Sequence, residues 1–423
     1  MNSNLMFVEG EDYYKNEIPE EFIEKQYFQK NKKHKYTLKV CGIISYSENN
    51  YLFFPKGYNV NTSEENNFEF ARTLFQVLNK YKKSVQISDV EYDWLGSEID
   101  QFDSIKLVEW LIDDFKNNGI YREDIENNAL NKNGRIDWAR TIKNQSPLIK
   151  NNEFVYVDVI TKNRQVNTNN VITLIHHKVI YECIKQFGWL FSIDRQIDYK
   201  DVPFEIGQQN IILEKKLSES FTNRQINLLK NLIAFINKAK NENIEFKVVT
   251  PYFYSIWEEM LKIVFGHNYT IQYNFPKPYW EMPNQLKKET VQIPDILIED
   301  EGDLVIIDAK YYSTYKGEVN KFPGWESVVK QLYYNLSVND RYEYIQNIFI
   351  MPESLYYNQK FKYIGKTSVL NKETEFGFVY AFSVDLYTIS NAYISNIYLK
   401  DLINEIIFNT KELINNECLD NKV

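Results

Sequence analysis

Two aspartates and a lysine in the C-terminal half of the chain have the residue types and spacing of a phosphodiester-cleaving site. Asp295 follows a proline, and thirteen positions later Asp308 is followed by Ala309 and Lys310. Carboxylate and backbone carbonyl oxygens are ligands that Mg²⁺ accepts. A lysine beside such an ion can orient the attacking water and stabilise the charge of a phosphorane-like transition state. We therefore expect Asp295, Asp308 and the Ala309 carbonyl to bind the metal and Lys310 to assist hydrolysis.

Two predicted strands position these residues. The segments IPDILIE (293–299) and LVIIDAKYY (304–312) flank a glycine-containing turn, which predicts a β-hairpin. Side chains alternate along a strand, so Asp308 and Lys310 share one face. They follow an apolar run, where unpaired charges would be costly to bury. An isolated Asp-x-Lys triplet is more often a surface ion pair, but its combination with the flanking helices favours a catalytic site.

Two predicted helices supply the other candidates. In the helix at 252–265, Glu258 borders the apolar stripe, whereas Glu259 is turned about 100° further toward solvent. We predict Glu258 as a third acidic ligand. On the helix at 325–337, Gln331 is predicted to hold the metal-bound water or a phosphate; simple solvation stays open for both residues. The stripe of the first helix comprises Tyr254, Trp257, Leu261, Val264 and Phe265.

Together these residues resemble the PD-(D/E)XK nuclease superfamily, with Pro294-Asp295, then Asp308-Ala309-Lys310, Glu258 before them and Gln331 after them. Within it, the segments WEEML, IPDILIE–VIIDAKYY and KQLYY are similar to LlaJI-type restriction endonucleases and, more distantly, to McrC-type nuclease subunits. The resemblance covers about residues 246–355, with short, less specific similarities in GRIDWARTI and LFFPKGY. One departure is that Tyr334 follows Gln331 by three positions, where the RecB-like branch has four.

The resemblance implies a restriction endonuclease that cleaves double-stranded DNA with Mg²⁺, or Mn²⁺ as a substitute, in bacterial defence against foreign DNA. It also implies partners: a cognate DNA methyltransferase and a McrB-like NTPase subunit. Cutting two strands requires either a homodimer on DNA or sequential nicking. One alternative function is a McrC-like nuclease subunit activated by the NTPase. The other is a non-catalytic DNA-binding or scaffold protein.

The order of the predicted elements indicates an α/β (α+β) multidomain fold. We expect a restriction-endonuclease-like core at 246–410, with a mixed β-sheet flanked by helices, and a polar tail at 411–423. Mixed and helical N-terminal regions precede the core. Residues 1–165 are predicted to recognise DNA or bind a partner, with a winged-helix element around 104–145 or a plain helical module in its place. Residues 166–245 are predicted to form a helical connector.

Composition excludes several other classes of protein. The 423-residue chain carries a formal net charge of −9, so binding to DNA depends on local clusters such as 30–35 and 80–83, whose alternative is a solvated surface. Its three cysteines and four histidines have no zinc-ligand spacing. Gly365-Lys366-Thr367 resembles a phosphate-binding loop but lacks the glycine at 360, which argues against NTP hydrolysis by this chain. Without a signal peptide or a membrane-length apolar run, we expect a cytoplasmic protein.

Overall fold

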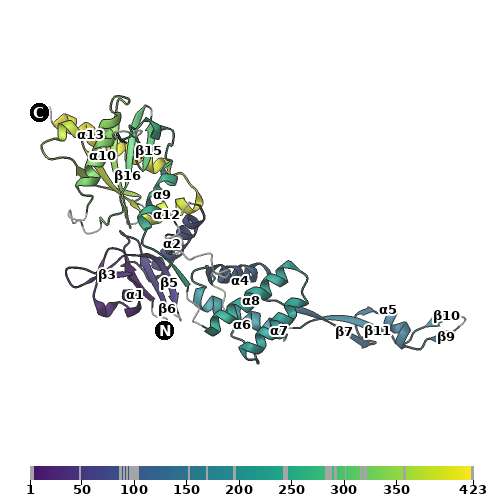
Figure 1. The fold of residues 1–423 in the computed structure, drawn as a ribbon. Helices are drawn as coiled ribbons and strands as arrows, with labels where there is room; N and C mark the ends of the chain where they lie inside the picture. The colour runs from purple at the N-terminus through teal and green to yellow at the C-terminus, as the bar shows by residue number, and fades with distance from the viewer. Residues whose placement is uncertain are drawn as a thin grey trace. The chain divides into compact units, whose positions relative to one another are not determined.

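The computed structural model contains both helices and mixed sheets, which confirms the α/β multidomain class (Figure 1). Contacts divide the chain into two compact units. Unit 1 joins Met1–Ser97 with Phe246–Val423, and unit 2 is Glu98–Glu245. The structure describes residues 4–46, 49–84, 88, 91, 94, 104–150, 153–167, 170–193, 197–241, 246–281, 288–289, 293–300, 302–314, 317, 322–355 and 359–420.

The N-terminal part of unit 1 is built on a four-stranded sheet of order β1-β6-β5-β12. Its strands are β1 (Asn4–Val8), β6 (Asn49–Phe54), β5 (Cys41–Tyr46) and β12 (Phe246–Thr250). A three-stranded sheet, β2 (Asp12–Tyr13), β4 (Tyr36–Leu38) and β3 (Phe28–Lys30), lies beside it together with α1 (Glu20–Glu24). Buried aromatic rings fill the space between them, so part of the chain's aromatic content serves packing. The rings in contact include Phe7, Phe22, Tyr27, Phe28 and Phe53.

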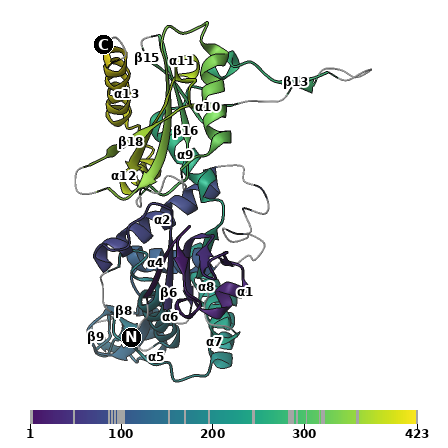
Figure 2. The same ribbon diagram turned by 90° about the vertical axis from the view of Figure 1, so that its left-hand side faces the viewer.

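The C-terminal part of unit 1 is built on a five-stranded mixed sheet of order β15-β16-β17-β19-β18. Strands β16, β17 and β19 are parallel, while β15 and β18 run antiparallel at the two edges. Helices cover both faces of the sheet (Figure 2). The strands are β15 (Ile296–Asp300), β16 (Asp303–Ala309), β17 (Ile345–Glu353), β18 (Phe361–Thr367) and β19 (Val379–Asp385). The helices are α9 (Phe253–Phe265), α10 (Trp325–Val338), α12 (Leu386–Ser395) and α13 (Lys400–Asp420).

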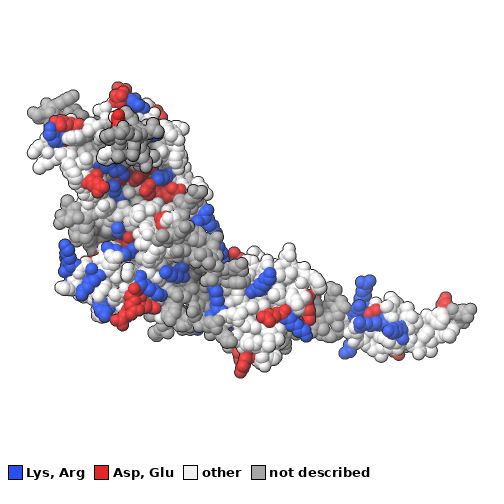
Figure 3. Space-filling view, in the orientation of Figure 1, with Lys and Arg blue, Asp and Glu red and all other residues white. Residues whose placement is uncertain are grey.

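Unit 2 consists of four packed helices and a projecting arm. The helices are α4 (Ser104–Asn118), α6 (Val171–Phe187), α7 (Ile206–Ser218) and α8 (Asn223–Asn241). The arm is an antiparallel ribbon of β7 (Glu123–Leu130) and β11 (Ile160–Asn167), with β8 (Arg135–Ile136) beside β11. Beyond the ribbon lie α5 (Trp138–Asn144) and the hairpin of β9 (Leu148–Lys150) and β10 (Glu153–Val155) (Figure 1). Apolar side chains are exposed there, and Lys and Arg side chains gather around α5 (Figure 3).

These units differ from the boundaries expected at 165, 245 and 410. Strand β12 pairs along its length with β5, so residues after 245 complete a sheet that the N-terminus begins. Helix α4 packs on α6 and α8 and is followed by the ribbon, an arrangement that matches the plain helical module given as the alternative to a winged helix around 104–145. The predicted polar tail begins inside α13, which continues to Asp420.

In the C-terminal part of unit 1, the predicted helices agree more closely with the structure. The helix expected at 252–265 is α9, and the one expected at 325–337 is α10. Residues 268–274, whose Tyr, Ile and Thr residues are typical of a strand, instead include a 3₁₀ helix at Ile271–Asn274, and Ile271 packs in the core beneath the sheet. Across the described ranges, we find no helix that is both long and apolar enough to cross a bilayer.

Candidate active site

Asp295 and Asp308 meet where β15 begins and β16 ends. The antiparallel register pairs Ile296 with Ile307, which places the two aspartates opposite each other just beyond that pair. The amide of Ala309 donates to Asp295 Oδ2 over 2.9 Å. The Asp308 side chain is only 3% exposed. Because the turn closes the hairpin without a bulge, residues thirteen positions apart become neighbours.

The two carboxyl groups repel each other in a poorly solvated place. Burial raises the pKa of Asp295 well above its usual range, and the nearby charges of Asp308 and Glu258 raise it further. The hydrogen bond from Ala309 acts in the opposite direction but is outweighed. Two acids in this environment call for a compensating positive charge.

Lysines supply positive charge in the structure. Lys310 Nζ lies 2.5 Å from Asp308 Oδ2, and Lys330 Nζ lies 3.8 Å from Asp308 Oδ1. The Lys310 side chain is mostly buried, whereas that of Lys330 is 42% exposed. Lys330 thus offers a cation that is accessible to a polyanionic substrate at the edge of the buried acidic pair.

Glu258 approaches the pair from α9. Its charge acts on Asp295, and its Oε1 lies 2.5 Å from Lys262 Nζ, one helical turn further along. The buried face of α9 is centred on Trp257, so Glu258 lies at the border of that face. Tyr254 is 52% exposed and does not belong to the apolar stripe, because Phe253 and Ile256 occupy the buried positions instead.

Gln331 is buried beside the pair but uses its amide for the fold. Its Nε2 donates to the Ile306 carbonyl over 2.9 Å, which ties α10 to β16 two residues before Asp308. Its Oε1 is buried and has no hydrogen-bond partner among the described residues. One of the two amide hydrogens is therefore engaged, and the acceptor oxygen remains for water or a ligand. The Tyr334 hydroxyl donates to the Ile293 carbonyl over 3.4 Å.

The carboxylate oxygens of Asp295 and Asp308 suit a hard divalent cation. Glu258, the expected third acidic ligand, is paired with Lys262 instead. Within the part of the chain that the structure describes, no group of three His, Cys, Asp or Glu side chains is arranged to hold a metal. Glu258 is engaged by Lys262, which leaves the carboxylates of Asp295 and Asp308 as the two nearest donors. Their oxygen chemistry and mutual repulsion fit Mg²⁺. Glu258 would become a ligand only by exchanging its ion pair for the metal.

Lys262 is the residue at this site that sequence reasoning missed. Its signal was present in the spacing Glu258-x-x-x-Lys262, the favourable order of an i,i+4 ion pair. Lys330, next to Gln331 on α10, was not predicted as a site residue either, yet its Nζ lies 3.8 Å from Asp308 Oδ1. Both lysines emerge as site residues because α9 and α10 both pack against β16, the strand that ends at Asp308.

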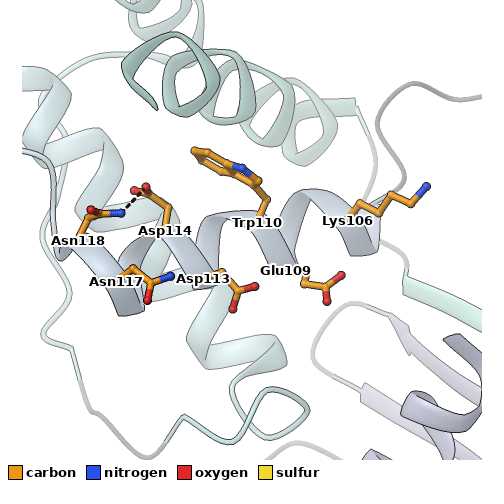
Figure 4. Close-up of a pocket in the computed structure, with 7 residues that line it drawn as sticks. All are labelled: Lys106, Glu109, Trp110, Asp113, Asp114, Asn117 and Asn118. Carbon is orange, nitrogen blue, oxygen red and sulfur yellow. Dashed lines mark hydrogen bonds between the residues drawn. The ribbon is translucent and has the colours of Figure 1, made fainter. Parts of the chain in front are cut away.

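A separate cavity of about 370 Å³ lies on α4 in unit 2. Figure 4 shows its lining side chains along one side of that helix. Asp114 is bound by Arg224 at 2.8 Å and by the Asn118 amide at 2.9 Å, so this acid is already compensated. None of the predicted site residues lines this cavity. The lining residues are Lys106, Glu109, Trp110, Asp113, Asp114, Asn117 and Asn118.

Comparison with known families places the chain among the restriction endonucleases. The model of the LlaJI restriction endonuclease family matches residues 40–385, and the chain therefore belongs to this family. The match includes Asp295, Asp308 and Lys310, and it extends well beyond the C-terminal sheet into the N-terminal part of unit 1 and all of unit 2.

Individual relatives are more distant. The chain is 23% identical over 381 residues to the Type II restriction enzyme BsuMI component YdjA of Bacillus subtilis (strain 168), which spans 85% of this chain and 80% of that protein. Among solved structures, a half-complex of Thermococcus gammatolerans McrB AAA+ hexamers with bound McrC gives a TM-score of 0.35 at 13% identity, over 96% of this chain and 100% of the other. The cryo-EM structure of the McrBC complex of the same organism gives 0.23 at 12% identity, over 56% and 80%. Both scores are too low to establish a shared fold.

Proposed function

We propose that this restriction endonuclease hydrolyses phosphodiester bonds of double-stranded DNA at the Asp295–Asp308 pair with the help of Mg²⁺, as a PD-(D/E)XK enzyme. The observation that carries the proposal is the buried carboxylate pair with Lys310 at 2.5 Å from Asp308. An ion pair serving only the fold would be expected at an exposed turn, without a second acid opposite it. Membership of a restriction endonuclease family supports the same chemistry.

Each residue of the site would have a separate role in hydrolysis. Asp295, Asp308 and the Ala309 carbonyl would hold the ion, with Glu258 joining after it leaves Lys262. The bound metal would polarise a phosphoryl oxygen and lower the pKa of a coordinated water. Lys310 would orient the attacking water and stabilise negative charge that develops on the phosphoryl group. Lys330, the more exposed lysine, would contact the DNA backbone.

Cleavage of plasmid DNA by purified protein tests this assignment. We expect Asp308→Asn to abolish cutting in Mg²⁺ and in Mn²⁺ while DNA retention on a filter stays unchanged, and we expect EDTA to stop the wild-type protein. The matched control is Asp303→Asn at the other end of β16, where Asp303 pairs with Lys411 at 3.0 Å. Undiminished cutting by Asp308→Asn would remove the site from the mechanism.

The second candidate function is a McrC-like nuclease subunit that cuts only with a McrB-like NTPase. The exposed apolar surface at the end of the arm favours it, because side chains such as Ile149 and Phe154 are about 70% exposed there. The relative from Bacillus subtilis is a restriction enzyme component, which also suggests a multisubunit enzyme. Under this function the chain alone is inert, and cutting appears when the NTPase and nucleotide are added. An Ile149→Ser, Phe154→Ser variant should then lose the response to the NTPase.

The non-catalytic scaffold, the homodimer on DNA and the cognate methyltransferase can each be tested by one measurement. DNA binding without cutting under either condition would favour the non-catalytic scaffold. A homodimer on DNA predicts twice the protomer mass on a specific duplex in mass photometry. A cognate methyltransferase predicts that DNA methylated by it resists cutting.

A further inference from the structure

Tyr311, the residue directly after Lys310, is held by the N-terminal sheet of unit 1. Its buried hydroxyl donates to Glu9 Oε2 over 2.7 Å and accepts from the backbone amide of Lys56 over 2.9 Å. Glu9 follows the last residue of β1, and Lys56 follows β6. Both hydrogen-bonding directions of the phenol are therefore satisfied by residues some 250 to 300 positions away in the sequence.

Lys56 also contacts the backbone of Tyr311. Its Nζ lies 3.5 Å from the Tyr311 carbonyl oxygen, 4.8 Å from the centre of the Tyr311 ring and 4.0 Å from Glu9 Oε1. The ring of Phe253, at the start of α9, packs against Tyr311 with 5.5 Å between ring centres. The tyrosine is thus fixed at its hydroxyl, its ring and its carbonyl, which leaves the chain after Lys310 little freedom.

The loop that carries Lys56 also packs against β17. A side chain at Gly57, where φ is +84°, would place its Cβ 2.1 Å from the Pro352 carbonyl oxygen of β17. The amide of Ser354 donates to the Gly57 carbonyl over 2.9 Å. The amide of Lys310 in turn donates to Ile350 of the same strand over 2.9 Å. The segment LFFPKGY at 52–58 therefore packs on the ends of both strands that border Lys310.

Glu9 is an unusual residue for a purely structural contact. Its side chain is only 8% exposed, and burial raises its pKa to about 7, while Lys56, the Tyr311 hydrogen bond and Lys39 act in the opposite direction. A buried glutamate this costly is replaceable by a neutral acceptor if only packing matters. Its position between the Lys56 ammonium and the Tyr311 hydroxyl points to a defined geometry at Tyr311.

We propose that Glu9, Lys56 and Tyr311 are positioning residues that hold Lys310 against Asp308, so that the N-terminal sheet forms part of the catalytic apparatus. The proposal rests on the function assigned above to Lys310. The N-terminal part of unit 1 was expected to recognise DNA or bind a partner. Through the contacts of Glu9 and Lys56 with Tyr311, it would also support the chemical step.

The test compares single-atom changes in the full-length protein, assayed in the preparation in which the wild type cuts DNA. Tyr311→Phe removes only the hydroxyl, and Glu9→Gln keeps the shape but removes the charge. We expect each to lower kcat about 10- to 100-fold while KM for DNA changes less than about twofold. Because the residues act as one unit, the double variant should be little worse than Tyr311→Phe alone.

Tyr13→Phe is the matched control. The Tyr13 hydroxyl accepts from the amide of Val8 over 2.7 Å, on the same part of the molecule but without contact to Tyr311. We expect it to leave kcat unchanged even if its thermal stability falls as much as that of Tyr311→Phe. Equal kcat values for Tyr311→Phe and Tyr13→Phe, or losses that appear only in KM, would overturn the proposal.

A second measurement does not depend on cutting. Hydrogen exchange of the peptide that spans Ala309 to Tyr311 should be faster in Tyr311→Phe and Glu9→Gln than in Tyr13→Phe. If the wild-type protein cuts no DNA under any condition, the proposed function fails, but this comparison still decides whether the N-terminal sheet holds the end of β16. Unchanged exchange in both variants would refute the positioning role.

Discussion

The buried carboxyl group of Glu9 predicts how the stability of the protein changes with pH. Its pKa is about 7 in the folded chain against an ordinary value of 4.5. A group whose pKa is raised on folding binds more protons when folded than when unfolded between these two values, so stability falls as the pH rises through that window. A difference of this size corresponds to about 3 kcal/mol between pH 4.5 and pH 8.

Glu9→Gln removes this dependence because the amide does not ionise. Urea unfolding of the wild type and the variant should therefore diverge, with the variant gaining about 3 kcal/mol relative to the wild type between pH 4.5 and pH 8. Unit 2 is identical in both proteins and cancels in the difference. The groups that act on Glu9 are Lys56, Lys39, Tyr311 and Cys41, and they stay unchanged.

Glu20→Gln serves as the control, because it makes the same chemical change in a side chain that is 75% exposed and pairs with Lys15. The divergence expected for Glu9→Gln should exceed any difference seen for this exposed position. Parallel curves for the wild type and Glu9→Gln across the whole range would refute the reasoning, since they would mean that Glu9 ionises in the folded chain as it does in the unfolded one.

Three further predictions concern packing around the site, each measured by urea unfolding. Trp257→Ala empties a fully buried position and should cost about 3–5 kcal/mol, whereas Tyr254→Ala on the exposed side of the same helix should change stability by less than about 0.5 kcal/mol. Gln331→Met keeps the volume but removes the hydrogen bond to the Ile306 carbonyl, for an expected loss of about 0.5–1.5 kcal/mol; a variant as stable as the wild type would contradict this. Lys80, on α2 (Glu64–Ser84), binds Asn396 and the final carbonyls of α12 through its ammonium, so Lys80→Met should cost about 1 kcal/mol. Lys83→Met, at an exposed position of α2, should cost nothing measurable.

The arrangement around Asp308 was largely predictable because it depends on local rules. A hairpin with a short turn brings Asp295 and Asp308 together, and strand alternation puts Lys310 beside Asp308. The helical period of α9 places Glu258 at the border of the buried face of that helix, so its proximity to the site could also be predicted. Each of these steps involves residues within a few turns or strands of one another, where sequence spacing determines geometry.

The remaining features depend on contacts that local patterns do not encode. Helix α4 has the same amphipathic spacing whether it packs in a winged helix or in a plain helical module against α6 and α8, so its sequence left both alternatives open. Residues 268–274 are rich in Tyr, Ile and Thr, which favour strands, yet packing of Ile271 beneath the sheet produces a 3₁₀ turn. Lys80 belonged to a basic cluster for which a solvated surface was the alternative, whereas its ammonium binds the end of α12. The links of Glu9 and Lys56 to Tyr311 span almost the whole sequence.

The pairing of β12 with β5 has a consequence for the order in which the protein is made. Unit 2 is inserted between the two segments of unit 1, so about 200 residues are synthesised after β5 before its partner strand leaves the ribosome. During that interval the edge of β5 is open, while all of unit 2 is already available to fold. A ribosome stalled where residue 245 has just left the exit tunnel should therefore carry a protease-resistant unit 2 and a protease-sensitive N-terminal segment. Resistance of the N-terminal segment should appear only once β12 has emerged.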